Sequence, residues 1–199
     1  MLKLDSAKAA FATIGAALVL SGCASVGSYT PPSSLTGDDA KNEVVVDKPF
    51  DATWASLIDY ASSTFFAIDN FEKASGLITL SFGSSDPGRF IDCGQIVSQS
   101  GNFNGPYTTY MATQLRATLT GKMNLVVRQV DPNRTLVRAN ARYIFVAPPQ
   151  AQVSGESWTF ESGGQATVTV ANPVSGTIPT RTCRPTYAAE KAILDAVKK

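Results

Sequence analysis

The sequence predicts an α+β domain, with one antiparallel sheet of about six strands and two helices packed on it. The first observation is the segment 134–146, in which apolar residues alternate with arginines and an asparagine. The second is the turn sequence DPN at 131–133, which separates this segment from another strand-like one. The third is that apolar residues recur at helical spacing in two further segments, 51–65 and 186–197.

The folded domain is expected over residues 42–199, and it begins with a β-branched strand at 43–46. Asp51 is placed to cap the helix that follows. This helix is expected to end near residue 65, because its apolar residues form one stripe along a helix face: Trp54, Leu57, Ile58, Ala61 and Phe65. On this spacing we expect Trp54 to anchor the core.

Strand-like segments fill the middle of the chain. Those at 65–69 and 76–82 are joined by the turn-forming sequence EKASG. Residues 90–97 form the next candidate strand, and 98–107 are expected to be a loop. The two strands on either side of the DPN turn are expected over 113–130 and 134–146, which predicts a long hairpin.

The last part of the chain predicts a second hairpin, an edge strand and a helix. The sequences SWTFES and QATVTVA flank Gly163-Gly164 and are expected to pair with each other. Pro179 places the strand that reaches Cys183 at a sheet edge, because proline cannot donate to a neighbouring strand. Pro185 and Thr186 then open the helix that ends the chain.

The first 22 residues have the features of an export signal. A weakly positive start precedes an uncharged, mostly apolar run at 9–20. This run is shorter than the roughly 20 residues that a helix needs to span a bilayer. The small residues Ser21 and Gly22 follow, and they lead directly to Cys23.

The sequence Leu20-Ser21-Gly22-Cys23 resembles the bacterial lipobox, in which the cysteine sulfur receives a diacylglyceryl group and the cysteine becomes the new N-terminus. Acyl chains on Cys23 would anchor the protein in a membrane. Ala24 stands where Asp would favour retention in the inner membrane, so the sorting pattern implies an outer-membrane location facing the periplasm. A secretory signal with a chance cysteine and a poor transmembrane helix are the two other interpretations.

Residues 24–41 are rich in Ser, Gly, Pro and Asp and contain few large apolar side chains. Such a segment buries too little surface to offset the entropy cost of ordering. The sequence therefore divides into a lipoprotein signal at 1–22, an acylated cysteine with a flexible linker at 23–41, and a single α+β domain at 42–199.

Two cysteines remain after Cys23. Cys93 and Cys183 are 90 residues apart, and the periplasm is an oxidising compartment, so we expect them to form a disulfide. Two buried free thiols are the alternative. A bridge over such a long loop typically contributes about 2–4 kcal/mol to stability.

The chain contains no histidine. This excludes Ser-His-Asp and Cys-His catalysis and His-ligated zinc. There is also no C-x-x-C pair and no glycine-rich phosphate loop between a strand and a helix. We therefore expect no metal, no cofactor and no enzymatic activity. The near balance of 17 basic and 16 acidic residues gives no electrostatic argument for a nucleic-acid partner.

Two functions fit these observations. The first is a membrane-anchored, periplasm-facing lipoprotein that acts as a non-catalytic protein-binding or assembly module of the cell envelope. The alternative is a carboxylate-dependent cell-wall hydrolase, which the expected location alone supports. Two carboxylates about 5–9.5 Å apart in a cleft would favour the hydrolase, whereas an exposed apolar or mixed patch would favour the binding module.

Residues 44–82 combine a strand, a Pro-Phe-Asp sequence before a helix, a tryptophan three residues after the Asp, a hydrophobic strand and the sequence Ser-Gly-Leu-Ile. This stretch resembles one repeat unit of the BamC family, whose members are lipoprotein subunits of the outer-membrane β-barrel assembly machinery. The resemblance implies a helix-grip architecture, in which an antiparallel sheet wraps against a helix. The family carries two such domains and a long N-terminal stretch, whereas this chain has room for one domain.

Four arginines fall in the segments expected to form the sheet: Arg116, Arg128, Arg138 and Arg142. Arg138 and Arg142 are four residues apart in one strand, so both lie on the same face, opposite the apolar residues. The guanidinium group binds carboxylates in pairs, so this face is a candidate site for an acidic segment of an envelope protein or for an anionic envelope component. The alternative is a solvated sheet face.

The lipobox predicts a fatty-acylated Cys23. Cells grown with an alkynyl fatty acid are expected to label the native chain and to leave the Cys23→Ala variant unlabelled, because only the cysteine sulfur accepts the diacylglyceryl group. In-gel fluorescence after coupling to an azide dye measures the label. A native chain that takes up no label would show that the anchor is absent.

Overall fold

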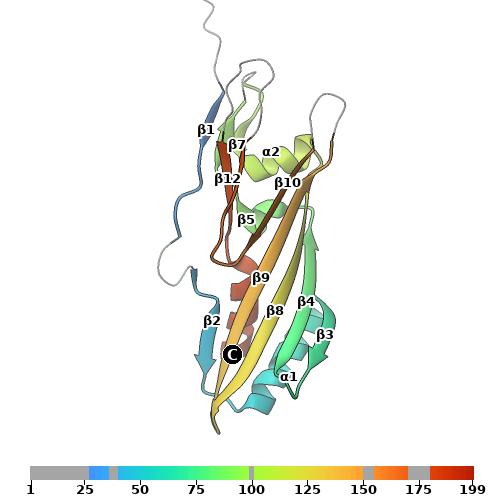
Figure 1. Ribbon diagram of the computed structural model, residues 1–199, viewed down its shortest axis with the longest axis vertical. Coiled ribbons are helices and arrows are strands. Elements are labelled where there is room, and N and C mark those ends of the chain that lie inside the picture. Colours follow the sequence, from blue (N-terminus) through green and yellow to red (C-terminus); the bar gives the residue numbers. More distant parts are fainter. Residues whose placement is uncertain (1–26, 36–39, 99–100, 150–154, 170–179) are drawn as a thin grey trace, which may run out of the picture.

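Six strands form the main antiparallel sheet of the computed structural model, which describes residues 27–35, 40–98, 101–149, 155–169 and 180–199. The strand order is β10-β9-β8-β4-β3, and β2 also pairs with β9. Figure 1 shows that β8 and β9 run along most of the molecule. The signal and Cys23 lie outside the described residues. The strands are β2 (Glu43–Val46), β3 (Ala67–Glu72), β4 (Leu77–Ser84), β8 (Thr118–Asp131), β9 (Arg134–Ala147) and β10 (Glu156–Glu161).

The long hairpin predicted around residues 131–133 is confirmed. Strands β8 and β9 are 14 residues each, and their register places Lys122 opposite Arg142 and Leu125 opposite Ala139. Odd-numbered residues of β9 are buried, while most even-numbered ones face solvent. The period of two thus gives the sheet one core face and one outer face.

Two helices cover the core face. α1 (Phe50–Ser63) and α3 (Ala188–Lys198) pack against each other and against β9, and both lie behind the sheet in Figure 1. The predicted stripe of α1 is confirmed for Trp54, which is 6% exposed and stacks on Phe50 with ring centroids 5.8 Å apart. Asp51 makes no capping bond and instead pairs with Lys73 at 2.8 Å.

A cluster of aromatic rings fills the core between β4 and the end of α1. Phe82 contacts four other rings, with centroids between 5.2 and 6.3 Å away. Its own position depends on Gly121, which lies opposite it on β8. A Cβ atom on Gly121 would come within 2.1 Å of the Phe82 ring, so the close packing requires glycine there.

β2 and β10 share one edge of β9 and leave a gap between them. β2 pairs with residues 135–138 and β10 with residues 142–147. In the gap, the Ala139 N–H donates to the Asn42 carbonyl at 2.8 Å, and the Ala141 N–H donates to Ser162 Oγ at 2.7 Å. The Ser162 N–H returns a bond to the Ala141 carbonyl. Backbone groups that a missing strand would leave unpaired are thereby satisfied.

A buried carboxyl group ties α3 to this edge. Glu190 is fully buried and accepts hydrogen bonds from Tyr143 Oη at 2.5 Å and from Ser162 Oγ at 2.7 Å. Burial raises the pKa of Tyr143, and the neighbouring carboxyl of Glu190 raises it further. Both oxygens of the carboxyl group therefore have partners, as a buried polar group requires.

Two small sheets and a short helix form the other end of the molecule, at the top of Figure 1. The expected disulfide between Cys93 and Cys183 is present. It joins the chain between β5 and β6 to β12. The elements of this end are β1 (Ser28–Thr30), β6 (Gln95–Val97) and β7 (Asn104–Pro106) in one sheet, β11 (Ala166–Thr169), β12 (Thr180–Pro185) and β5 (Ile91–Asp92) in the other, and α2 (Tyr107–Gln114).

The structure has three helices in its described part rather than the two expected. α2 occupies residues predicted as loop and as the start of a strand. It follows Pro106 and buries Tyr107 and Met111, which are four residues apart and so share a helix face. The helix ends where two N–H groups, of Leu115 and Ala117, donate to the Met111 carbonyl.

Three further expectations differ from the structure. The strand predicted at 90–97 is two strands, β5 and β6, in different sheets, because the chain turns at Gly94 with φ of +78°. The hairpin predicted around Gly163-Gly164 does not form a ladder, since β10 pairs with β9 and β11 pairs with β12. β12 is central in its sheet rather than at an edge, while Pro179 lies outside the described residues.

Part of the expected linker is also structured. Residues 28–30 form β1, which pairs with β6, although the composition of 23–41 predicted a flexible segment. Tyr29 provides the physical reason, because its ring packs edge-on against Tyr107 with centroids 6.2 Å apart. A single aromatic side chain thus gives a polar segment enough contact to dock.

Gly121 and Gly83 provide a matched pair for testing the close packing at Phe82. Gly121→Ala should displace the Phe82 ring and lower the free energy of unfolding by about 1–3 kcal/mol. Gly83→Ala should change it by less than about 0.5 kcal/mol, since its Cβ would meet only the Leu119 carbonyl oxygen, at 3.5 Å. Urea unfolding of both variants measures the difference, and equal effects would contradict this account.

Candidate functional site

A cavity of about 520 Å³ lies across β4, β8 and β9 on the outer sheet face. We call it the outer-face groove. Cross-strand pairing builds it in two rows: Ser81, Lys122 and Arg142 in one, and Gly83, Thr120 and Ile144 in the next. Its full lining is Phe65, Ala67, Ser81, Phe82, Gly83, Thr120, Gly121, Lys122, Arg142 and Ile144.

The groove exists because side chains are missing or small at its floor. Gly83 carries no side chain on the outer face, and the neighbouring strand β3 begins only at Ala67, opposite Ser81. Beyond that point, within the described residues, β4 pairs with β8 alone. Phe65 and Ile144 supply apolar walls, and Ile144 is 37% exposed. An apolar depression of this size can receive a large side chain of a partner.

Two cations rim the groove, and they differ in how they are neutralised. Lys122 lies 3.9 Å from Asp69, whose carboxylate also accepts a hydrogen bond from Ser81 at 2.8 Å. Arg142 forms no ion pair with any residue in the described part of the chain, although Glu161 is its register neighbour on β10. The Arg142 guanidinium is therefore available to bind a carboxylate beside the apolar walls.

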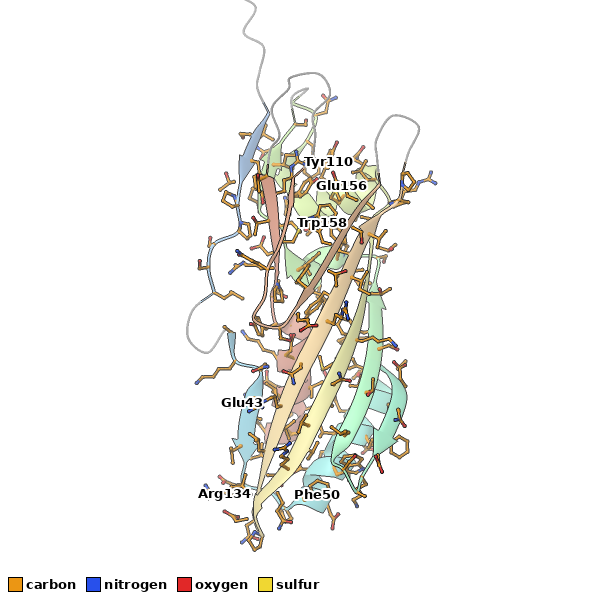
Figure 2. The ribbon with its side chains drawn as sticks, in the orientation of Figure 1. Glu43, Phe50, Tyr110, Arg134, Glu156 and Trp158 are labelled. Carbon is orange, nitrogen blue, oxygen red and sulfur yellow. A yellow bond between two sulfur atoms is a disulfide. The ribbon has the colours of Figure 1, made fainter. Side chains whose placement is uncertain are left out.

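The structure separates the four arginines proposed from the sequence. Arg138 and Arg142 lie on the same outer face, as the period of two predicts. Arg138 is held by Glu43 of β2, with contacts of 2.6 and 2.8 Å, and Figure 2 shows Glu43 in the lower half of the molecule. Arg128 is exposed near the hairpin turn. Arg116 lies outside the sheet, with φ of +54° between α2 and β8.

Only Arg142 of these four lines the groove, and the sequence argument missed Lys122, Gly83 and Ile144 as its neighbours. Lys122 could have been found, because a hairpin turn at 131–133 aligns it with Arg142 across β8 and β9. No comparable feature of the sequence indicated that residues of β4 would line the groove. The register of β4 with β8 joins segments about forty residues apart in the chain.

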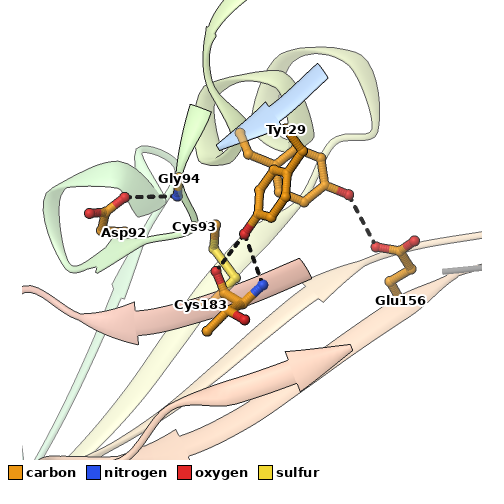
Figure 3. The surroundings of a disulfide bond; sticks show 8 residues. Tyr29, Asp92, Cys93, Gly94, Glu156 and Cys183 are labelled. Carbon is orange, nitrogen blue, oxygen red and sulfur yellow. Dashed lines mark hydrogen bonds between the residues drawn. A yellow bond between two sulfur atoms is a disulfide. The ribbon is translucent and has the colours of Figure 1, made fainter. Parts of the chain in front are cut away.

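A second cluster of interacting side chains lies beside the disulfide. In Figure 3 the hydroxyl of Tyr29 contacts the backbone of β12. The hydroxyl of Tyr107 lies 3.5 Å from Glu156 Oε2. Arg181 lies over the ring of Tyr107, with its Cζ 4.4 Å from the centroid. The cluster therefore couples β1, α2, β10 and β12 through aromatic and charged groups.

The pKa values of Tyr29, Tyr107 and Glu156 in this cluster are all raised. Burial raises the pKa of the Glu156 carboxyl, although the charge of Arg181 and the hydroxyl of Tyr107 oppose the shift. Burial likewise raises the pKa of Tyr107 to about 12. A cell-wall hydrolase would need a second carboxylate near the first. The groups that act on Glu156 are Arg181 and Tyr107, so this cluster lends that alternative no support.

Comparison of the chain with protein-family models, with curated proteins and with solved structures finds no match. The resemblance of residues 44–82 to a BamC unit therefore stays a prediction. In the part of the chain that the structure describes, no helix is long and apolar enough to cross a membrane. The same residues contain no group of three or more Cys, Asp or Glu side chains arranged to hold a metal ion.

The raised pKa of Glu156 predicts a pH-dependent effect of its removal. A raised pKa means that the Glu156 carboxyl binds its proton more tightly in the folded state than in the unfolded state. Its contribution to the free energy of unfolding therefore falls as the pH rises from the unfolded-state pKa through the folded-state pKa. Glu156→Gln should therefore gain stability relative to the native chain between about pH 4 and pH 8. Chemical unfolding across this range measures the difference. Glu161→Gln, at an exposed position of β10, gives the baseline for removing one carboxylate.

Proposed function

We propose that the protein is a lipid-anchored module of the outer membrane that faces the periplasm and binds another envelope protein without catalysing a reaction. The observation that carries the binding function is the outer-face groove, where the guanidinium of Arg142, which forms no ion pair with the described residues, borders an apolar depression. A partner segment that presents a carboxylate next to a large apolar side chain would satisfy both features.

The sequence supports the anchor. An apolar run, two small residues and Cys23 occur in the order of a lipobox, and acyl chains on that cysteine would hold the domain at a membrane. The disulfide between Cys93 and Cys183 is consistent with folding in an oxidising compartment. Export and acylation are thus parts of the same proposal.

The architecture also suggests a relationship. α1 and α3 lie on one face of an antiparallel sheet, and residues 50–84 supply α1, β3 and β4 in succession. This arrangement is consistent with a helix-grip unit of the kind that the BamC resemblance implies. We therefore include a role in an envelope assembly among the functions of the binding face, with the resemblance as its support.

The charge of Arg142 provides the test of the binding function. Envelopes from cells with the native chain are crosslinked, the chain is purified, and the attached proteins are identified by mass spectrometry. Arg142→Ser should shrink this set and make the remaining retention less sensitive to salt, because a charge-assisted contact is lost.

Arg138→Ser is the matched control. It removes the same side chain from the same strand and face, but Glu43 already neutralises that arginine. We expect it to leave the partner set unchanged, and both variants to unfold within about 0.5 kcal/mol of the native chain, as exposed substitutions usually do. A partner set that Arg142→Ser leaves intact would contradict the role of the groove.

A further inference from the structure

Strand β1 is fastened to the small-sheet end of the molecule. The Tyr29 hydroxyl accepts a hydrogen bond from the Thr182 N–H at 2.9 Å and donates one to the Thr182 carbonyl at 3.1 Å. Next to it, the Thr30 carbonyl lies so close to Gly94 that a Cβ atom there would come within 2.1 Å. The docking of β1 is thus built into β12 and into the turn beside the disulfide.

This docking shortens the connection to the proposed anchor. Five residue steps separate Cys23 from Ser28, the first residue of β1. An extended chain of that length spans at most about 18 Å. If β1 did not dock, the linker would run from Cys23 to residue 42. The folded domain could then lie more than three times farther from the lipid than docked β1 allows. β1 therefore restricts which part of the domain can be near the membrane.

The part of this end that directly follows Asp92 in the chain carries no charge. No charged residue occurs from Cys93 to Leu115, the stretch that contains β6, β7 and α2. Val97 is 38% exposed, and Phe103 and Tyr110 are partly buried. Such a surface can approach lipid headgroups without desolvating ions, and aromatic side chains favour that boundary.

Two of the nearby arginines, Arg184 and Arg116, are compatible with such an approach. Arg184 pairs with Asp92 at 3.3 Å, so this pair is already neutralised within the protein. Arg116 directly follows the uncharged stretch and is exposed, and a cation there is attracted by lipid phosphates. The opposite end, by contrast, has an exposed ion pair of Asp131 and Arg134.

We propose that the protein stands end-on at the membrane, with the uncharged end formed by β1, β6, β7 and α2 against the lipid headgroups and the β8–β9 turn pointing away. This inference rests on the proposed acylation of Cys23. β1 and the turn lie at opposite ends of the long axis in Figure 1, and Figure 2 places Tyr110 and Arg134 accordingly. The outer-face groove then opens sideways, where a partner on the same membrane can reach it.

Energy transfer to labelled lipid tests this orientation. Full-length acylated protein carries a donor dye at Asn102→Cys, near the uncharged end, or at Asn133→Cys, in the β8–β9 turn. Both positions are exposed, and the native thiols are bridged or acylated, so only the introduced cysteine reacts. The vesicles contain phosphatidylethanolamine and phosphatidylglycerol with an acceptor dye on a small fraction of the headgroups.

We expect transfer from Asn102→Cys to exceed transfer from Asn133→Cys at least about two-fold, because the length of β8 alone, roughly 45 Å, separates the two positions along the long axis. Inserting about twelve Gly and Ser residues after Ala24 should reduce this difference, since a longer flexible link lets the domain tilt.

Flotation of the vesicles separates the two ways in which the inference can fail. Protein that floats with the vesicles but shows equal or reversed transfer would overturn the end-on orientation and leave the anchor in place. Protein that does not float would overturn the anchor and the orientation together. A difference that persists unchanged after the insertion would show that the short link does not set the orientation.

Discussion

The pairing of β8 with β9 is the constraint on which the rest of the molecule depends. Both strands are 14 residues long. β2, β4 and β10 pair directly with one of them, and β3 is added through β4. A tight turn at 131–133 sets their register, and a slip by one residue would turn the whole core face outward. The same register places Lys122 beside Arg142, so the turn also determines the chemistry of the groove.

Local sequence patterns predicted the strands and helices whose buried residues recur at a regular spacing. They failed where the structure depends on contacts between segments that are far apart in the sequence. The alternation of 134–146 and the stripe around Trp54 were strong because one face of each is fully buried. α2 was missed because its sequence, YTTYMATQ, has three threonines and only a short apolar repeat. The predicted pairing of β10 with β11 was wrong. β10 pairs with β9 instead, where Trp158 stacks on Phe145, and this contact joins segments that are separate in the sequence.

The candidate site shows the same division. Period-two spacing was sufficient to place Arg138 and Arg142 on one face, but their different electrostatics come from β2, which brings Glu43 to Arg138 across 95 residues of sequence. The hollow beside Arg142 arises from Gly83 and from the point at which β3 begins. Neither is visible in a charge pattern. A face that looks uniform in sequence is therefore divided into one neutralised arginine and one available arginine.

The disulfide also has a consequence for the order of events during folding. A chain that crosses a membrane N-terminus first delivers Cys93 long before Cys183, and the whole β8–β9 hairpin emerges between them. Cys93 must therefore wait for its partner while β8, β9 and β10 emerge, with Cys23 as the one other thiol in the chain. The proposed acylation of Cys23 would remove that competitor. Lipid attachment would then act as a protecting group during oxidative folding and would leave a single pairing for the two remaining thiols.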